Sequence, residues 1–179
     1  MEVALNGEVA GKARAVRLLV LDVDGVLTDG RLIYTDDGAE AKAFDVKDGH
    51  GIKLLQRSGV DVAIVTGRTS GVVEHRARNL GIELVYQGML DKTRALDDII
   101  ERTGLDAGEL AYVADDVVDL PFLSRVGFSV AVADASGEVR ARADYVTTRP
   151  GGRGAVREVC ELILKAQGSW DRVMARYRD

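Results

Sequence analysis

Two aspartates, Asp22 and Asp24, follow directly on an apolar run in the stretch LLVLDVDGVLTDG. Such a run predicts a buried strand, and unpaired charge at the end of a buried strand is costly. One carboxylate could attack phosphorus and form an acyl phosphate. A second carboxyl group, two residues on, could protonate the leaving alcohol and then activate water. The pair alone is weak evidence, because Asp-x-Asp also occurs in turns.

Polar side chains also follow the next three apolar runs. They are Thr66, Arg68, Lys92, Asp115, Asp116 and Asp119. The carboxyl ends of the strands form the ligand-binding edge of an open α/β sheet, so we expect these groups to converge. Converging carboxylates suit Mg²⁺, and a lysine with a threonine hydroxyl suits phosphoryl oxygens. Each residue alone could be a turn or a helix cap, but the ordered set indicates phosphoryl chemistry.

The elements that must position these residues alternate along the chain. The expected strands are 17–22, 60–66, 83–86, 110–114, 127–131 and 144–146. The expected helices are 49–58, 70–80, 91–103, 117–126, 137–142 and 152–167, and glycines follow several of them. This alternation predicts a doubly wound, Rossmann-like α/β fold. Its sheet is mainly parallel, with helices on both faces.

One segment, residues 31–44, interrupts the alternation. Its Asp37-Gly38 pair between two short strand-like arms predicts a β-hairpin. The hairpin follows the first strand, at the edge where ligands bind in such sheets. It could line or cover a site, or it could be a decoration of the sheet edge.

Composition limits the class of protein. The 179 residues suit one domain, which we expect over residues 15–168, between a flexible N-terminal arm (1–14) and a C-terminal tail (169–179). The net charge of −5 argues against nucleic-acid and anionic-membrane partners. No stretch approaches the roughly 18 apolar residues of a membrane helix, and the single cysteine, Cys160, fits a packed helix face. We therefore expect a cytoplasmic protein.

The short motifs LDVDGVLTDG, VTGR, DK and ADDVVD resemble those of the haloacid dehalogenase-like phosphohydrolases. Longer stretches, such as KAFDVKDGHGIKLL, YQGMLDK and GGRGAVREVCELIL, are similar to one family among them, the 3-deoxy-D-manno-octulosonate 8-phosphate phosphatases. This resemblance covers residues 17–167. It implies a Mg²⁺-dependent phosphomonoesterase of a small acidic sugar phosphate, working through an aspartyl-phosphate in lipopolysaccharide precursor synthesis.

The resemblance also implies a role for each matching residue. Asp22 would be the nucleophile and a metal ligand, and Asp24 the general acid/base with its backbone carbonyl on the metal. Asp115 would be the third metal ligand, and Thr66 and Lys92 would bind the phosphoryl group. Asp116 and Asp119 would be supporting carboxylates. The implied substrate-binding residues are Asp24, Asp45, Val46, Lys47, Asp48, Gly49, Lys53, Arg68, Arg76 and Lys92.

Relatives of this kind have no separate cap domain and form homotetramers. In them the hairpin and a neighbour's C-terminal segment close the site, and Arg153 could reach a neighbour in the same way. Two positions depart from the family pattern. Ala114 stands where glycine is usual, which would disturb the metal loop if that position needs positive φ. Asp45 stands where many relatives have asparagine, which leaves the sugar open.

Several alternative functions remain. A phosphatase of a nine-carbon ulosonate 9-phosphate would use the same chemistry. A receiver-like signalling module also gathers aspartates, threonine and lysine around Mg²⁺, but its acidic pair precedes the phosphorylated aspartate, whereas here Asp115 and Asp116 come late. The third alternative is a non-catalytic tetramerisation domain. Phosphate release in the presence of Mg²⁺ distinguishes an enzyme from the last two.

Overall fold

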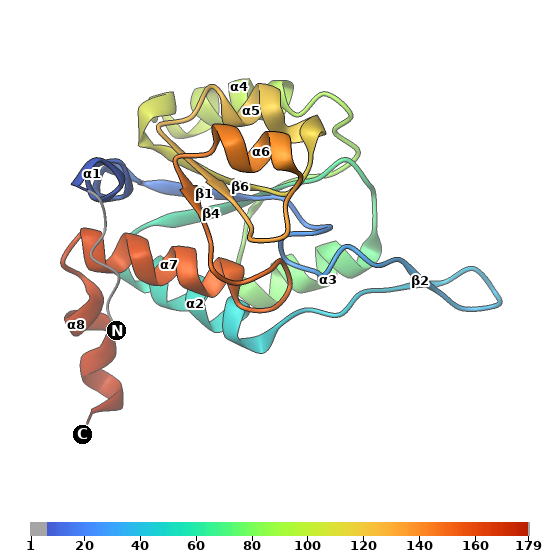
Figure 1. The fold of residues 1–179 in the computed structure, drawn as a ribbon. Coiled ribbons are helices and arrows are strands. Elements are labelled where there is room, and N and C mark those ends of the chain that lie inside the picture. The colour runs from blue at the N-terminus through green and yellow to red at the C-terminus, as the bar shows by residue number, and fades with distance from the viewer. Residues whose placement is uncertain (1–6, 179) are drawn as a thin grey trace.

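A six-stranded parallel sheet forms the centre of the computed structural model, which describes residues 7–178 (Figure 1). Its strand order is β5-β4-β1-β6-β7-β8. The strands are β1 (Leu18–Leu21), β4 (Asp61–Val65), β5 (Leu84–Tyr86), β6 (Leu110–Ala114), β7 (Phe128–Ala131) and β8 (Tyr145–Val146). Leu21 pairs with Ile64 on one side and Val113 on the other, so the chain leaves all three strands at the same edge. The predicted parallel α/β fold is confirmed.

Helices cover both faces of the sheet (Figure 1). One face carries α2 (Val46–Ser58), α3 (Gly71–Leu80) and α7 (Ala155–Ala166). The opposite face carries α4 (Thr93–Thr103), α5 (Leu120–Leu123) and α6 (Gly137–Arg142). All four residues of β1 are buried between these layers, which explains why its sequence is continuously apolar.

The predicted hairpin forms from β2 (Ile33–Tyr34) and β3 (Glu40–Ala41), which pair in antiparallel register. It extends away from the body of the protein (Figure 1). Gly38 at its turn has φ of +82°, a conformation that favours glycine. Between β1 and α2, the described chain forms this hairpin and no separate cap domain.

Three predicted helices have wrong boundaries, among them α7, which begins at Ala155 and not at residue 152. Helix α2 begins at Val46, earlier than expected, because the Asp45 side chain caps it by accepting from the Lys47 N–H. The stretch predicted as one helix over 117–126 divides into a 3₁₀ turn, η2 (Val117–Asp119), and the short α5. Pro121 stands near the start of α5, where a missing N–H is tolerated.

Both ends of the described chain pack on the domain. Residues 7–15 form helix α1 (Gly7–Ala15), in place of the flexible arm expected there; residues 1–6 of that arm lie outside the described residues. Ala13 is buried, and the Arg14 Nε donates to the carbonyl of Ala166 in α7. The predicted tail forms α8 (Trp170–Met174) and the 3₁₀ turn η3 (Ala175–Tyr177). A further 3₁₀ turn, η1 (Ala107–Glu109), precedes β6. No helix among residues 7–178 is both long and apolar enough to span a bilayer.

Candidate active site

Asp22 lies immediately after β1, at the edge of the sheet where the predicted site residues were expected. Its Oδ1 accepts from the Val23 N–H at 2.7 Å, and its Oδ2 lies 2.9 Å from the Lys92 Nζ. The residue is 6% exposed. Burial raises the pKa of Asp22 to about 6, even though Lys92 lowers it. These contacts hold the Asp22 carboxylate in one orientation.

Lys92 is clamped between two carboxylates and is itself nearly covered. Besides Asp22, its Nζ lies 2.5 Å from Asp119 Oδ1 and 3.3 Å from the hydroxyl of Tyr112. The Tyr112 hydroxyl donates to the same Asp119 oxygen at 2.8 Å. Burial lowers the pKa of Lys92, but the two carboxylates outweigh burial and raise it. The ammonium therefore stays charged beside Asp22.

Three carboxylates gather at this edge: Asp22, Asp115 and Asp119 each offer an oxygen, and these oxygens lie within 4.8 Å of one another. Burial and the charges of Asp22 and Asp119 raise the pKa of Asp115 to about 7. The Asp119 Oδ2 is buried without a hydrogen-bond partner among the described residues. Repelling carboxylates with an unpaired buried oxygen fit a divalent cation.

Ala114 does not disturb this cluster. It is the last residue of β6 and is fully buried. Among the described residues, positive φ occurs only at glycines, so Ala114 needs no conformation that its methyl group would oppose. The glycine that matters here is Gly25, at φ of +89°, whose Cα faces the Asp115 carboxylate.

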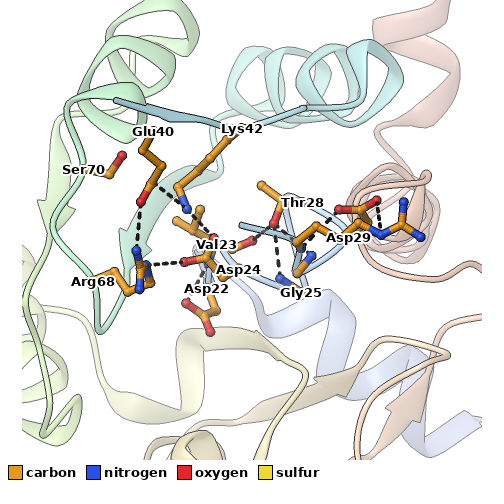
Figure 2. Close-up of polar contacts among 12 residues, drawn as sticks. Asp22, Val23, Asp24, Gly25, Thr28, Asp29, Glu40, Lys42, Arg68 and Ser70 are labelled. Carbon is orange, nitrogen blue, oxygen red and sulfur yellow. Dashed lines mark hydrogen bonds and ion pairs between the residues drawn. The ribbon is translucent and has the colours of Figure 1, made fainter. Parts of the chain in front are cut away.

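The Asp24 carboxylate points toward Lys42 of the hairpin and Arg68 (Figure 2). Its Oδ1 lies 2.5 Å from the Nζ of Lys42, and its Oδ2 lies 3.7 Å from the Nε of Arg68. Both cations also contact Glu40 of β3. The hydrogen bond from Arg68 and the nearby Lys42 ammonium lower the pKa of Glu40 to about 2. Lys42 was not predicted as a site residue; its one signal in the sequence is an isolated lysine between alanines at the base of the hairpin.

Thr66 stands one residue beyond β4, at the same edge as Asp22. It is 2% exposed, its N–H donates to the carbonyl of Tyr86, and its carbonyl accepts from Met89. These bonds tie the Thr66 backbone to β5 and to the loop that leads to Lys92. The structure therefore brings Asp22, Asp24, Thr66 and Lys92 to one edge, as predicted.

The segment 45–49, expected to be a sugar-binding loop, is instead the cap and first turn of α2. The Asp48 carboxylate is buried and accepts from the N–H groups of Gly154 and Arg157 at the start of α7. It therefore joins α2 to the start of α7. In contrast, Val46 is 80% exposed and the Lys47 side chain 67% exposed.

Arg76 and Lys53, which were also predicted to contact the substrate, make contacts within the protein. The Arg76 Nη2 lies 3.4 Å from the carbonyl of Asp45, and its guanidinium lies over the Phe44 ring. It also fills the space beside Gly49, where an added Cβ would lie 2.4 Å from the Arg76 Nη2. The Lys53 Nζ donates to the carbonyl of Leu80 at the end of α3. Arg76 and Lys53 therefore hold α2 and α3 together.

The remaining candidates lie at the periphery. Asp116 caps η2 by accepting from the Val117 N–H. The Arg153 Nη2 lies 3.9 Å from Asp29. Asp29 belongs to the catalytic loop, which is residues 22–30 after β1. Cys160 is buried in α7, as predicted.

Comparisons with known proteins bear on this arrangement. Residues 82–158 match the haloacid dehalogenase-like hydrolase family. The 3-deoxy-D-manno-octulosonate 8-phosphate phosphatase KdsC of Escherichia coli strain K12 is 50% identical over 167 residues, which are 93% of this chain and 89% of the relative. This chain belongs to the KdsC family. The Yersinia pestis member is 48% identical over 89% of this chain and 86% of its own length.

Solved structures of KdsC-family phosphatases share the fold. The Moraxella catarrhalis 3-deoxy-D-manno-octulosonate 8-phosphate phosphatase, solved with magnesium, phosphate and KDO, superposes with a TM-score of 0.95 at 44% identity. It covers 97% of this chain and 100% of its own. The cobalt-bound Haemophilus influenzae phosphatase has a TM-score of 0.88 at 42% identity, covering 92% and 97%. As a family member, this chain is a phosphoric monoester hydrolase, so the receiver-like and non-catalytic alternatives are excluded.

Proposed function

We propose that this KdsC-family enzyme hydrolyses 3-deoxy-D-manno-octulosonate 8-phosphate to the free sugar and phosphate, as a cytoplasmic step in lipopolysaccharide precursor synthesis. The observation that carries the proposal is the division of contacts between two neighbouring carboxylates. Asp22 contacts Lys92 and lies in the acidic cluster, whereas Asp24 contacts Lys42 and Arg68. One is therefore set to act on phosphorus, and the other to move a proton.

In the first step, an oxygen of Asp22 attacks phosphorus and the bond from phosphorus to the sugar oxygen breaks. Asp24 gives its proton to the departing oxygen, which leaves an aspartyl-phosphate on Asp22 and an ionised Asp24. Asp24 then takes a proton from water, and the resulting hydroxide attacks the phosphoryl group and restores Asp22. Lys92 offsets the charge on the phosphoryl oxygens, and the Thr66 hydroxyl binds one of them.

The acidic cluster fits the Mg²⁺ that the Moraxella catarrhalis relative holds. In this chain, the carboxylates of Asp22 and Asp115 and the backbone carbonyl of Asp24 would hold the ion. When bound, it would offset the repulsion between the carboxylates and the negative charge of the phosphoryl group. Asp119 adds a third carboxylate to the same cluster, which increases the repulsion that a cation would offset.

The sugar itself carries a carboxylate in addition to its phosphate. Among the predicted basic contacts, Arg68 and Lys47 have exposed side chains, at 43% and 67%. Arg76 and Lys53 bind helix carbonyls instead. We therefore narrow the basic substrate contacts to Arg68 and Lys47, with Lys92 at the phosphate. The Asp45 carboxylate caps α2 by accepting from the Lys47 N–H. The presence of aspartate at this position therefore does not favour a nine-carbon substrate.

The test is phosphate release from a panel of eight- and nine-carbon ulosonate phosphates. We expect the highest kcat/KM with the eight-carbon substrate, complete loss on adding a chelator, and recovery with Mg²⁺. Asp22→Asn should abolish turnover, because an amide cannot form the acyl phosphate. Asp171→Asn is the matched control, since that side chain is 80% exposed on α8. Chelator-resistant activity in Asp22→Asn would contradict the proposed mechanism, and preference for a nine-carbon substrate would change the assigned sugar.

A further inference from the structure

Lys42 is a buried ammonium group at the base of the hairpin. Its side chain is 1% exposed, and a lysine in such a position must be paired, because removing its charge from water is costly. Its Nζ lies 2.5 Å from Asp24 Oδ1 and 3.0 Å from Glu40 Oε1. It is therefore closed off from solvent and directed at the predicted general acid/base.

These contacts belong to a closed ring of alternating charge, seen in Figure 2. Glu40 Oε2 lies 2.8 Å from the Nη2 of Arg68, and the Nε of Arg68 lies 3.7 Å from Asp24 Oδ2. Each Asp24 oxygen thus contacts a different cation, and Glu40 holds both cations. The ring connects the hairpin, the catalytic loop and the turn after β4.

Within this ring, Lys42 is the contact that orients Asp24 most strongly. The Arg68 side chain is 43% exposed and its contact with Asp24 is longer, and solvent weakens exposed ion pairs. The contact of Lys42 is short and covered. Because its ammonium is covered, Lys42 can reach the substrate only through Asp24.

We propose that Lys42 is a positioning residue that orients the carboxyl group of Asp24 for proton transfer to and from the reacting oxygens. This inference rests on the proposed function, in which Asp24 moves the proton. Lys42 keeps its own proton throughout. In the first step, the proton passes from Asp24 to the sugar oxygen as the bond to phosphorus breaks. The role of the hairpin was left open by the sequence. Under this proposal, the hairpin supplies the residue that positions the general acid/base.

The experiment compares two substrates whose leaving groups differ in their need for a proton. A sugar phosphate releases an alcohol, which must be protonated, whereas p-nitrophenyl phosphate releases a stable phenolate. The quantity measured is kcat/KM, because it reports the steps up to departure of the leaving group. Lys42→Met should lower kcat/KM by about 100-fold for the sugar phosphate and by less than about 5-fold for the aryl phosphate. Lys42→Arg should recover part of the loss.

The Asp24→Asn background separates action through Asp24 from action elsewhere. If Lys42 works through Asp24, adding Lys42→Met to Asp24→Asn should cause no further loss with the sugar phosphate, because the two residues form one unit. Lys165→Met is the control for removing a lysine charge, since Lys165 pairs with Glu161 on the surface of α7. Circular dichroism checks the fold of each variant. If Lys42→Met does not fold, Glu40→Gln, which breaks the same ring, should show the same difference between substrates.

Three outcomes would overturn the inference: equal losses with both substrates, additive losses in the double variant, or a raised KM with unchanged kcat. If Asp24→Asn lowers kcat/KM equally for the sugar phosphate and the aryl phosphate, Asp24 is not the general acid/base. The proposed role of Lys42 is then wrong as well. If Asp24→Asn lowers kcat/KM more for the sugar phosphate than for the aryl phosphate, but Lys42→Met lowers both equally, only the proposed role of Lys42 is wrong.

Discussion

Gly25 shows how a residue with no side chain shapes the active site. A Cβ at this position would lie 2.1 Å from the Oδ2 of Asp115 and 2.5 Å from its Cγ. Contacts this short do not occur, so any side chain at position 25 would force the carboxylate away. The Asp115 carboxylate can approach Asp22 only because the chain turns at a glycine.

Gly25→Ala should therefore lower kcat by about 100-fold or more and weaken the stabilisation by Mg²⁺, since a misplaced ligand loses much of its effect. Gly38→Ala is a matched control: its φ of +82° is close to the +89° of Gly25, but no atom lies within 4 Å of its Cβ position. In both variants, alanine at positive φ should lower the free energy of unfolding by about 1 kcal/mol. Only Gly25→Ala also displaces Asp115. Steady-state kinetics and melting with and without Mg²⁺ measure the difference. Equal kcat losses in the two variants would contradict this explanation.

Helices α2 and α7 are joined through Asp48, whose carboxylate accepts two N–H groups at the start of α7. A carboxylate near a helix N-terminus is favourable, because the helix dipole is positive there. The same residues lie next to the glycine-rich loop before α7, in which the Gly152 N–H donates to the carbonyl of Val26. Asp48 thus supports the catalytic loop through packing, and a direct contact with the sugar is not needed to explain it.

Asp48→Ala should lower the free energy of unfolding by about 2 kcal/mol or more, because it leaves two N–H groups without an acceptor. Urea unfolding measures this change. Asp116→Ala removes a single exposed cap contact, to Val117, and should lower the same quantity by about 1 kcal/mol. For the folded fraction of Asp48→Ala, KM should stay close to that of the wild type. An unchanged stability with a raised KM would instead assign Asp48 to the substrate.

The hairpin exposes apolar side chains that have no packing partner within a single described chain. It extends from the body (Figure 1), and its residues Leu32, Ile33 and Tyr34 are 44%, 49% and 56% exposed. Neighbouring apolar side chains on a projecting element favour contact with another surface. We therefore keep the homotetramer as a prediction, with the hairpin at an interface between copies.

The variant Leu32→Ser/Ile33→Ser should lower the molar mass in solution below that of four chains, because it removes apolar area from the proposed interface. Light scattering coupled to gel filtration measures the mass. Asp36→Asn, at the polar and exposed tip of the hairpin, is the control. A wild-type protein that elutes as a single chain would contradict the tetramer, and an intact tetramer in the double variant would exclude the hairpin from the interface.

Several predictions from the sequence held because they depend on local pattern. Continuous apolar runs identified the strands, and the Asp37-Gly38 pair identified the hairpin. For other residues, neighbours distant in sequence decide what the side chain contacts. Asp48 and Lys53 were placed at the substrate, yet they bind the backbone of α7 and of α3. Lys42 went unnoticed, because nothing in its own segment shows that Asp24 will lie beside it.

By itself, the sequence determined the α/β fold and the edge at which Asp22, Asp24, Thr66, Lys92 and Asp115 meet. It could do so because parallel strands bring their carboxyl ends together, whatever the details of packing. Only the tertiary structure decided which way each side chain points: Asp22 toward Lys92, Asp24 toward Lys42, and Asp48 toward α7. Those orientations depend on burial and on ion pairs between segments far apart in the chain, and residue spacing carries no information about them.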